Sequence, residues 1–170
     1  KLVSTFCKTH SINKVSVVSS LRTSELKDFV CEHPLKNLGY NFLVKLFEAN
    51  HVTDEAGTGF VHIAPNHGLE DFDVGKKNNL GNLTTVDESG IYTSNVPFFN
   101  GTHIFKADEN VVNELRNSKK LISCNNYFHS YPHSWRSKAP LIYRATSQWF
   151  ISLDHKNLRN KALSEIDKVK

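Results

Sequence analysis

Residues 57–72 read GTGFVHIAPNHGLEDF. This short stretch holds two glycine turns, two histidines, a proline and an acidic pair. Glycine and proline are the strongest local markers of turns, and a plain structural segment seldom needs so many special-purpose residues together. We therefore expect the fold to turn here, and any chemistry to be concentrated here.

The first half of the stretch has the pattern of a strand. Period-two alternation predicts a strand over 59–64, in which Phe60, His62 and Ala64 share one face. Pro65 then ends the strand, because proline has no N–H to donate to a sheet. His62 is thus expected to point where Phe60 and Ala64 point.

The second half has the pattern of a helix start. Glu70 and Asp71 fall in the first turn of a helix that we expect to run to about Asn79, with Gly81 just past its end. Negative side chains in a first turn interact favourably with the helix dipole. The stretch is therefore predicted to be a strand, a turn and a helix.

The rest of the chain alternates short helical and extended patterns. A strand at 42–47 is expected to be buried on both faces, and turns are expected at 87–90 and 100–101. Segments 121–131 and 141–153 are rich in β-formers and aromatic residues. Further helices are expected at about 1–10, at 108–120 capped by Asp108, and after a cap at Asp154, and a further strand at about 15–17.

Composition is that of an ordinary globular protein, with 170 residues, 39% hydrophobic and 22% charged. No run approaches the roughly 20 apolar residues of a membrane-spanning helix, and no secretion signal is apparent, so we expect a cytoplasmic protein with no membrane partner. The three cysteines, at 7, 31 and 124, are far apart and indicate reduced thiols. Because the sequence contains no methionine, we interpret it as a piece of a longer protein.

The chemistry of the stretch has several readings on residues alone. His62, His67 and Asp71 could be metal ligands, but the turn at Pro65 breaks the regular helical spacing that makes a zinc motif convincing. Asp71 could equally serve only the helix dipole, and His62 could be a hydrogen-bonded histidine in a half-buried strand. Neither a G-x-S-x-G elbow nor a glycine-rich loop opening a helix is present, which disfavours covalent catalysis and nucleotide binding.

Three segments together resemble the editing domain of isoleucyl-tRNA synthetases, which are class I enzymes. GTGFVHIAPNHGLEDF is similar to their GTG-x-VH-x-AP-x-HG-x-x-D segment, and the stretches at 129–136 (HSYPHSWR) and 144–150 (RATSQWF) resemble their HSYPHCWR and RATPQWF stretches. The order and the distances agree. His62 favours the isoleucyl enzyme over its valyl and leucyl relatives.

The resemblance implies an α+β fold with a barrel-like mixed β core and peripheral helices, truncated at its N-terminus. It divides the chain into the C-terminal part of the editing domain, residues 1–120, and a β-rich return segment with a helix, residues 121–170, that leads back toward the catalytic domain. Two departures stand out. The threonine-rich TTTPWT-type segment of the editing pocket has no match, and Ser134 and Ser137 offer no zinc site where some relatives have cysteine.

The resemblance also implies a function, which is hydrolysis of valine wrongly attached to tRNA(Ile) by a positioned water without metal. The implied catalytic residues are Asp71, which would hold the α-ammonium, and His62, which would line the pocket. Substrate-binding residues would be Thr58, Gly59, Phe60, Ala64 and Pro65, with His67 in a supporting role behind them.

The implied partners are the 3′ end of tRNA(Ile) carrying valine and the remainder of the synthetase chain. ATP and Mg²⁺ are cofactors of the full-length synthetase only, and the fragment alone is expected to be inactive. Two alternatives remain open at this point: a non-catalytic structural module that contacts tRNA through lysines and arginines, and a metal-dependent hydrolase.

Overall fold

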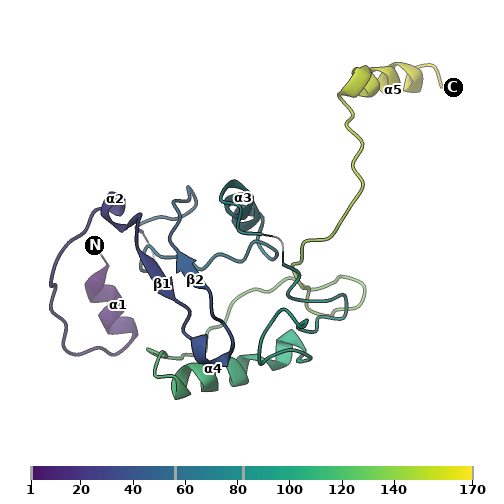
Figure 1. Cartoon of the computed structure of the whole chain (residues 1–170). Helices are drawn as coiled ribbons and strands as arrows, with labels where there is room; N and C mark the ends of the chain where they lie inside the picture. Colours follow the sequence, from purple (N-terminus) through teal and green to yellow (C-terminus); the bar gives the residue numbers. More distant parts are fainter. Residues whose placement is uncertain (1, 56, 82, 170) are drawn as a thin grey trace.

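The computed structural model describes residues 2–55, 57–81 and 83–169. It is an α+β arrangement in which the described strands form one two-stranded antiparallel sheet, with Val30 paired to Lys45 and Glu32 to Leu43. Figure 1 shows the elements in chain order. They are α1 (Val3–Thr9), α2 (Thr23–Leu26), β1 (Val30–Glu32), η1 (Lys36–Leu38), β2 (Leu43–Lys45), α3 (Leu69–Lys77), η2 (Ile104–Lys106), α4 (Asp108–Asn117), η3 (His155–Asn157) and α5 (Leu158–Ile166).

A small core joins the β1–β2 connection to α4. Leu35, Val96 and Phe99 are buried, and Val111 and Leu115 of α4 pack against them. Two contacts support this core, because the Tyr40 hydroxyl donates to the Pro97 carbonyl at 2.9 Å and Gly39 lies directly against the Pro97 ring. Gly39 has φ +103°, a left-handed conformation that favours glycine.

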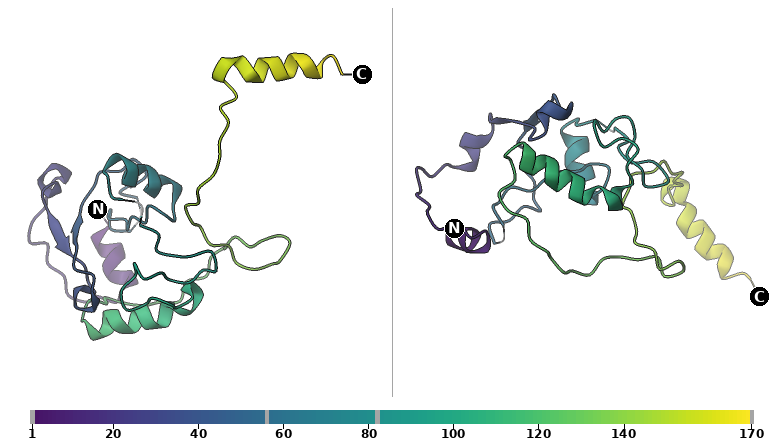
Figure 2. Two further views of the ribbon diagram at one scale, coloured as in Figure 1. Left: turned by 45° about the vertical axis from the view of Figure 1, so that its right-hand side comes forward. Right: turned by 90° about the horizontal axis from the view of Figure 1, so that it is seen from below.

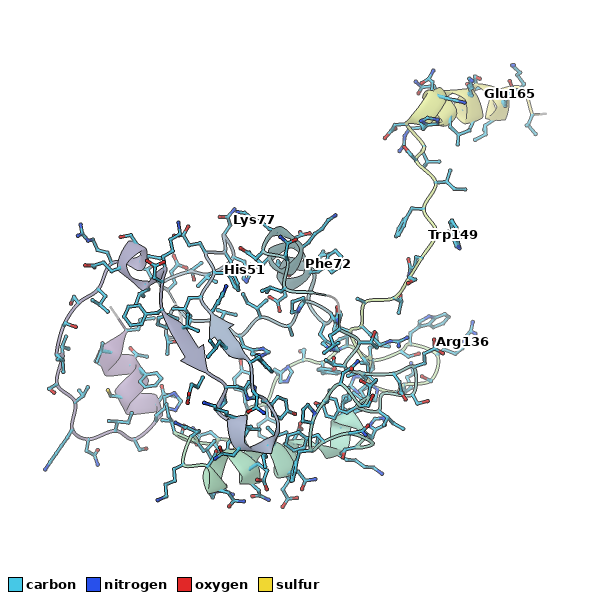
Figure 3. All side chains as sticks on the ribbon, in the orientation of Figure 1. His51, Phe72, Lys77, Arg136, Trp149 and Glu165 are labelled. Carbon is cyan, nitrogen blue, oxygen red and sulfur yellow. The ribbon has the colours of Figure 1, made fainter. Side chains whose placement is uncertain are left out.

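The chain is open outside this core. Its solvent-accessible surface is 14815 Å², whereas a compact folded chain of its 19.3 kDa mass exposes about 8,500 Å². Extended segments contribute to this surface, including an arm, residues 146–157, that carries α5 away from the rest of the chain (Figure 2). In Figure 3 the side chain of Trp149 projects from this arm, and it is fully exposed. Exposed apolar surface of this extent indicates an interaction surface.

Several expected elements are confirmed. The helix expected at 1–10 is α1, with Lys1 outside the described residues, and the helix expected to start in the acidic segment is α3. Asp108 lies in the first turn of α4, although its side chain makes no capping hydrogen bond. The turn at 87–90 also forms, because the Asp87 carboxylate accepts from the N–H groups of Ser89 and Ile91 at 2.8 and 2.9 Å.

Other expectations are wrong. The strand expected at 42–47 is shorter, and all three residues of β2 are exposed instead of buried. Residues 59–64 are irregular, as are 15–17, 121–131 and 141–153. A strand needs a neighbour to satisfy its N–H and C=O groups, and these segments have no ladder partner among the described residues. The described part of the chain is therefore an α+β fold with one two-stranded sheet, and the barrel stays a prediction.

Candidate functional site

A tight turn over 64–68 organises the site. The Ala64 carbonyl accepts from the N–H groups of His67 and Gly68, at 2.9 and 3.2 Å. In the other direction, the Ala64 N–H donates to Asp71 Oδ2 at 2.9 Å. Since Asp71 lies in the first turn of α3, this bond ties the start of the helix to the start of the turn.

Two glycines allow α3 to lie close to this turn. A Cβ on Gly75 would lie 2.7 Å from Pro65 Cβ and 2.9 Å from Pro65 Cγ, and Gly75 is the buried residue of α3. A Cβ on Gly68 would lie 3.0 Å from Asp71 Oδ2. A side chain at Gly75 would force a shift between α3 and Pro65, and one at Gly68 would crowd the Asp71 carboxylate, so both glycines help to set the position of Asp71.

The second oxygen of Asp71 is available. Asp71 Oδ1 lies 3.9 Å from His51 Nε2, and the two side chains are 20% and 29% exposed. It accepts no hydrogen bond from any residue that the structure describes. Asp71 therefore presents an anchored, partly buried carboxylate with one oxygen left for a cationic ligand.

His62 lies near a second histidine. His33 stacks on Tyr40 with ring centroids 4.5 Å apart and also contacts Phe42 at 5.1 Å. Burial lowers the pKa of His33 below its ordinary value, and the charge of His62 lowers it further. His62 itself is exposed, and this electrostatic effect is what links it to His33 in the segment after β1.

His67 points to the other side and joins two distant segments. Its Nδ1 is 2.7 Å from the Tyr143 carbonyl and its Nε2 is 2.9 Å from Thr85 Oγ1. The contact with the Tyr143 carbonyl requires Nδ1–H as a donor, so in the neutral imidazole Nε2 accepts from the threonine hydroxyl. With both ring nitrogens engaged, His67 has a structural role in holding this part of the fold together.

Asn66 extends the same junction. Its backbone carbonyl accepts from Ala145 N–H at 2.7 Å, and its side-chain amide donates to the Leu83 carbonyl. Beside it opens a cavity of about 270 Å³ between the turn, the segment after α3 and the start of the C-terminal arm. The cavity is lined by Asn66, His67, Phe72, Thr84, Thr85, Val86, Arg144, Ala145, Thr146 and Ser147.

The turn at 57–59 forms as expected, but the strand expected after it does not. Gly57 and Gly59 have φ of +64° and +78°, a region that favours glycine. Thr58 Oγ1 accepts from the Phe60 N–H at 3.2 Å, which closes the turn. Without a strand, however, Phe60 is 61% exposed, and the shared face predicted for Phe60, His62 and Ala64 does not exist.

Of the residues predicted for the site, the structure joins Asp71 to Ala64 by a hydrogen bond and packs Pro65 on Gly75 of the same helix. Sequence reasoning missed His51 and His33, which lie before the glycine turn and belong to no regular pattern. No residue spacing in the sequence reveals that these histidines approach Asp71 and His62.

Within residues 2–55, 57–81 and 83–169, no three histidine, cysteine, aspartate or glutamate side chains gather where they could hold a metal ion. In the same residues, no helix combines the length and the apolar character that crossing a bilayer requires.

No protein-family model matches the chain. Curated proteins named isoleucine--tRNA ligase do match it. The protein of Pelagibacter ubique is 46% identical over 169 residues, 99% of this chain and 19% of the relative. Those of Francisella tularensis subsp. novicida and Pseudoalteromonas atlantica are 41% and 43% identical over 97% and 95% of this chain, and 17% of each relative.

The chain spans less than a fifth of the length of these relatives. Conversely, the similarity covers nearly every residue of the chain, including all three segments quoted from its sequence. Over almost its whole length, the chain therefore corresponds to one segment of the isoleucyl-tRNA synthetases, which are aminoacyl-tRNA ligases.

Proposed function

We propose that this chain forms part of the editing site of an isoleucyl-tRNA synthetase and takes part in hydrolysis of valine wrongly attached to tRNA(Ile). The need for such a site follows from physics, because a missing methylene changes binding by only about 1–3 kcal/mol. A second pocket that excludes the larger isoleucine can remove the errors that the first pocket admits.

One observation carries the proposal. Asp71 is fixed through Oδ2 to the Ala64 N–H, and its Oδ1 is left for a ligand. Every aminoacyl ester carries an α-ammonium group, and an anchored carboxylate binds it through a charge-assisted hydrogen bond whatever the side chain. Asp71 is therefore proposed to hold the amino group, while the pocket walls select the side chain.

We assign the other residues around it as follows. His62 lines the pocket beside the substrate, and Thr58, Gly59, Phe60, Ala64 and Pro65 form the wall that the glycine turn and the tight turn build. A positioned water attacks the ester carbonyl, and the alcohol of the terminal ribose leaves. Because an aminoacyl ester is already activated, orientation of this water supplies the catalysis without metal or enzyme nucleophile.

The proposal extends to the whole enzyme. ATP and Mg²⁺ would serve aminoacylation by the full-length ligase, and the partners of this chain would be the 3′ end of tRNA(Ile) and the remainder of the synthetase. Residues 1–120 would belong to the editing domain, whose β core closes into a barrel with strands outside this chain, and residues 121–170 would lead toward the catalytic domain. The exposed apolar side chains of the arm support contact with further protein.

The test compares Asp71→Asn with Asp71→Ala in a full-length isoleucyl-tRNA synthetase that carries this segment. Asparagine keeps an oxygen for the Ala64 N–H but removes the negative charge. A hydrogen bond to a charged group is worth about 1.5–3 kcal/mol, so kcat/KM for valyl-tRNA(Ile) deacylation is expected to fall about 10- to 150-fold in both variants.

Asp73→Ala is the matched control, because Asp73 is an exposed aspartate on the same helix. It should deacylate like the wild type, and all variants should charge tRNA with isoleucine normally. Wild-type deacylation by Asp71→Asn would overturn the assignment. Loss of deacylation in a chelator that leaves Mg²⁺ in solution, and therefore leaves charging intact, would favour the metal-dependent alternative.

A further inference from the structure

Only one of the two carboxylate oxygens of Asp71, Oδ2, is held by a hydrogen bond from a described residue. Oδ2 is fixed by the Ala64 N–H at 2.9 Å, but the χ2 torsion of an aspartate is broad, so one bond does not define the direction of Oδ1. A second group that limits this rotation would raise the affinity for a ligand bound by Oδ1. The carboxylate would then be oriented before the ligand binds.

His51 lies where such a second group is needed, next to Oδ1. Its Nε2 lies 3.9 Å from Oδ1, too long for a direct hydrogen bond but within ion-pair range. With 29% and 20% of their side chains exposed, the two groups are partly shielded from solvent, where electrostatic attraction is stronger than at a free surface.

The local backbone brings His51 to this place. A turn after β2, closed by a hydrogen bond from the Val52 N–H to the Ala49 carbonyl at 3.3 Å, contains His51. Figure 3 shows His51 between the β1–β2 ribbon and α3. His51 therefore approaches Asp71 from a different segment than Ala64 does, and the two groups lie at different oxygens of the carboxylate.

We propose that His51 is a positioning residue, which directs Asp71 Oδ1 toward the α-ammonium of the misattached amino acid. This inference rests on the proposed function of Asp71. His51 does not touch the substrate in this scheme, and its effect passes entirely through the aspartate.

The test measures deacylation by the full-length synthetase that carries this segment, with two substrates. One is valyl-tRNA(Ile), and the other is the same tRNA carrying 2-hydroxy-3-methylbutanoate, in which a hydroxyl replaces the amine. His51→Ala is expected to lower kcat/KM for valyl-tRNA about 3- to 10-fold, mainly through KM, and to leave the hydroxy ester unaffected. His51→Lys, which supplies a positive charge within reach of Oδ1, should keep kcat/KM for valyl-tRNA closer to the wild-type value than His51→Ala does.

Two comparisons separate this role from a loss of structure. The double variant of His51→Ala with Asp71→Asn should be no slower than Asp71→Asn alone, because both changes act on one contact. Thr53→Ala, at an exposed position of the same loop, should match the wild type. Wild-type activity of His51→Ala, equal losses on both substrates, or additive losses in the double variant would each overturn the inference.

The outcomes also separate this inference from the proposed function. If Asp71→Asn deacylates normally, the proposed function fails and His51 has nothing to position. If Asp71→Asn is impaired and His51→Ala is not, the proposed function stands and only the role of His51 is refuted.

Discussion

Replacing Gly75 with alanine should displace Asp71 without touching it. The new Cβ would lie 2.7 Å from Pro65 Cβ, whereas carbon atoms in contact prefer about 3.5–4.0 Å, so α3 has to move by about 1 Å. Asp71 is one helical turn before Gly75 and moves with it. The 2.9 Å bond to the Ala64 N–H then lengthens, by up to about 1 Å where the shift lies along the bond, and weakens.

Two opposing terms determine the cost in stability. Alanine in a helix interior gains about 1 kcal/mol over glycine, and overpacking costs about 1–3 kcal/mol. The net destabilisation is therefore between roughly 0 and 2 kcal/mol. Activity is expected to respond more strongly, because a misplacement of about 1 Å in a catalytic group can cost about 100-fold in rate.

The assay is valyl-tRNA(Ile) deacylation by the full-length enzyme, with isoleucine charging as the measure of an intact catalytic domain. Gly75→Ala should lose about 10- to 100-fold in kcat/KM for deacylation and charge normally. Asp73→Ala, an exposed change that also raises helix propensity, should retain both activities. Wild-type deacylation by Gly75→Ala would refute the idea that packing of α3 on Pro65 positions Asp71.

Three further changes test other parts of the structure. His67→Ala removes contacts to Tyr143 and Thr85, and should make the arm cleave faster in limited proteolysis, with an unchanged rate arguing against this junction. Asp87→Ala removes two hydrogen bonds and should lower the free energy of unfolding by about 1–3 kcal/mol in urea titrations; no change would contradict the turn. The pKa of His33 lies below its ordinary 6.5, so stability from neutral His33 is complete above pH 6.5 and is lost as pH falls through the lower folded pKa. His33→Gln should remove that part of the acid sensitivity in the same titrations, and an unchanged pH profile would contradict it.

The sequence predicts the helices of this chain better than its strands. Acidic first turns locate α3 and α4 because a helix satisfies its own backbone groups locally. A strand needs a partner elsewhere, and residues 59–64 have none among the described residues, although their alternation is regular. Positive φ at Gly57 and Gly59 and the stop at Pro65 bound this segment.

The site is predictable to the same extent. Asp71 can be predicted from its place after the turn and from the resemblance of the stretch at 57–72 to the editing motif. Its hydrogen bond with Ala64 follows from the local fold. His51 and His33 are not predictable in this way, because the His51–Asp71 distance and the effect of His62 on His33 join segments that are separate in the sequence. Such contacts between distant segments have no signature in spacing.

The turn at 64–68 has a dynamic consequence. Its amides and carbonyls bond within the turn, to α3 and to the segment at 143–145, while His67 and Asn66 reach Thr85 and Leu83. Groups that share their bonds in this way open together or not at all. Amide hydrogen exchange at Ala64, His67, Gly68 and Ala145 should therefore show one common opening free energy, and a ligand bound to Asp71 should slow all four amides at once.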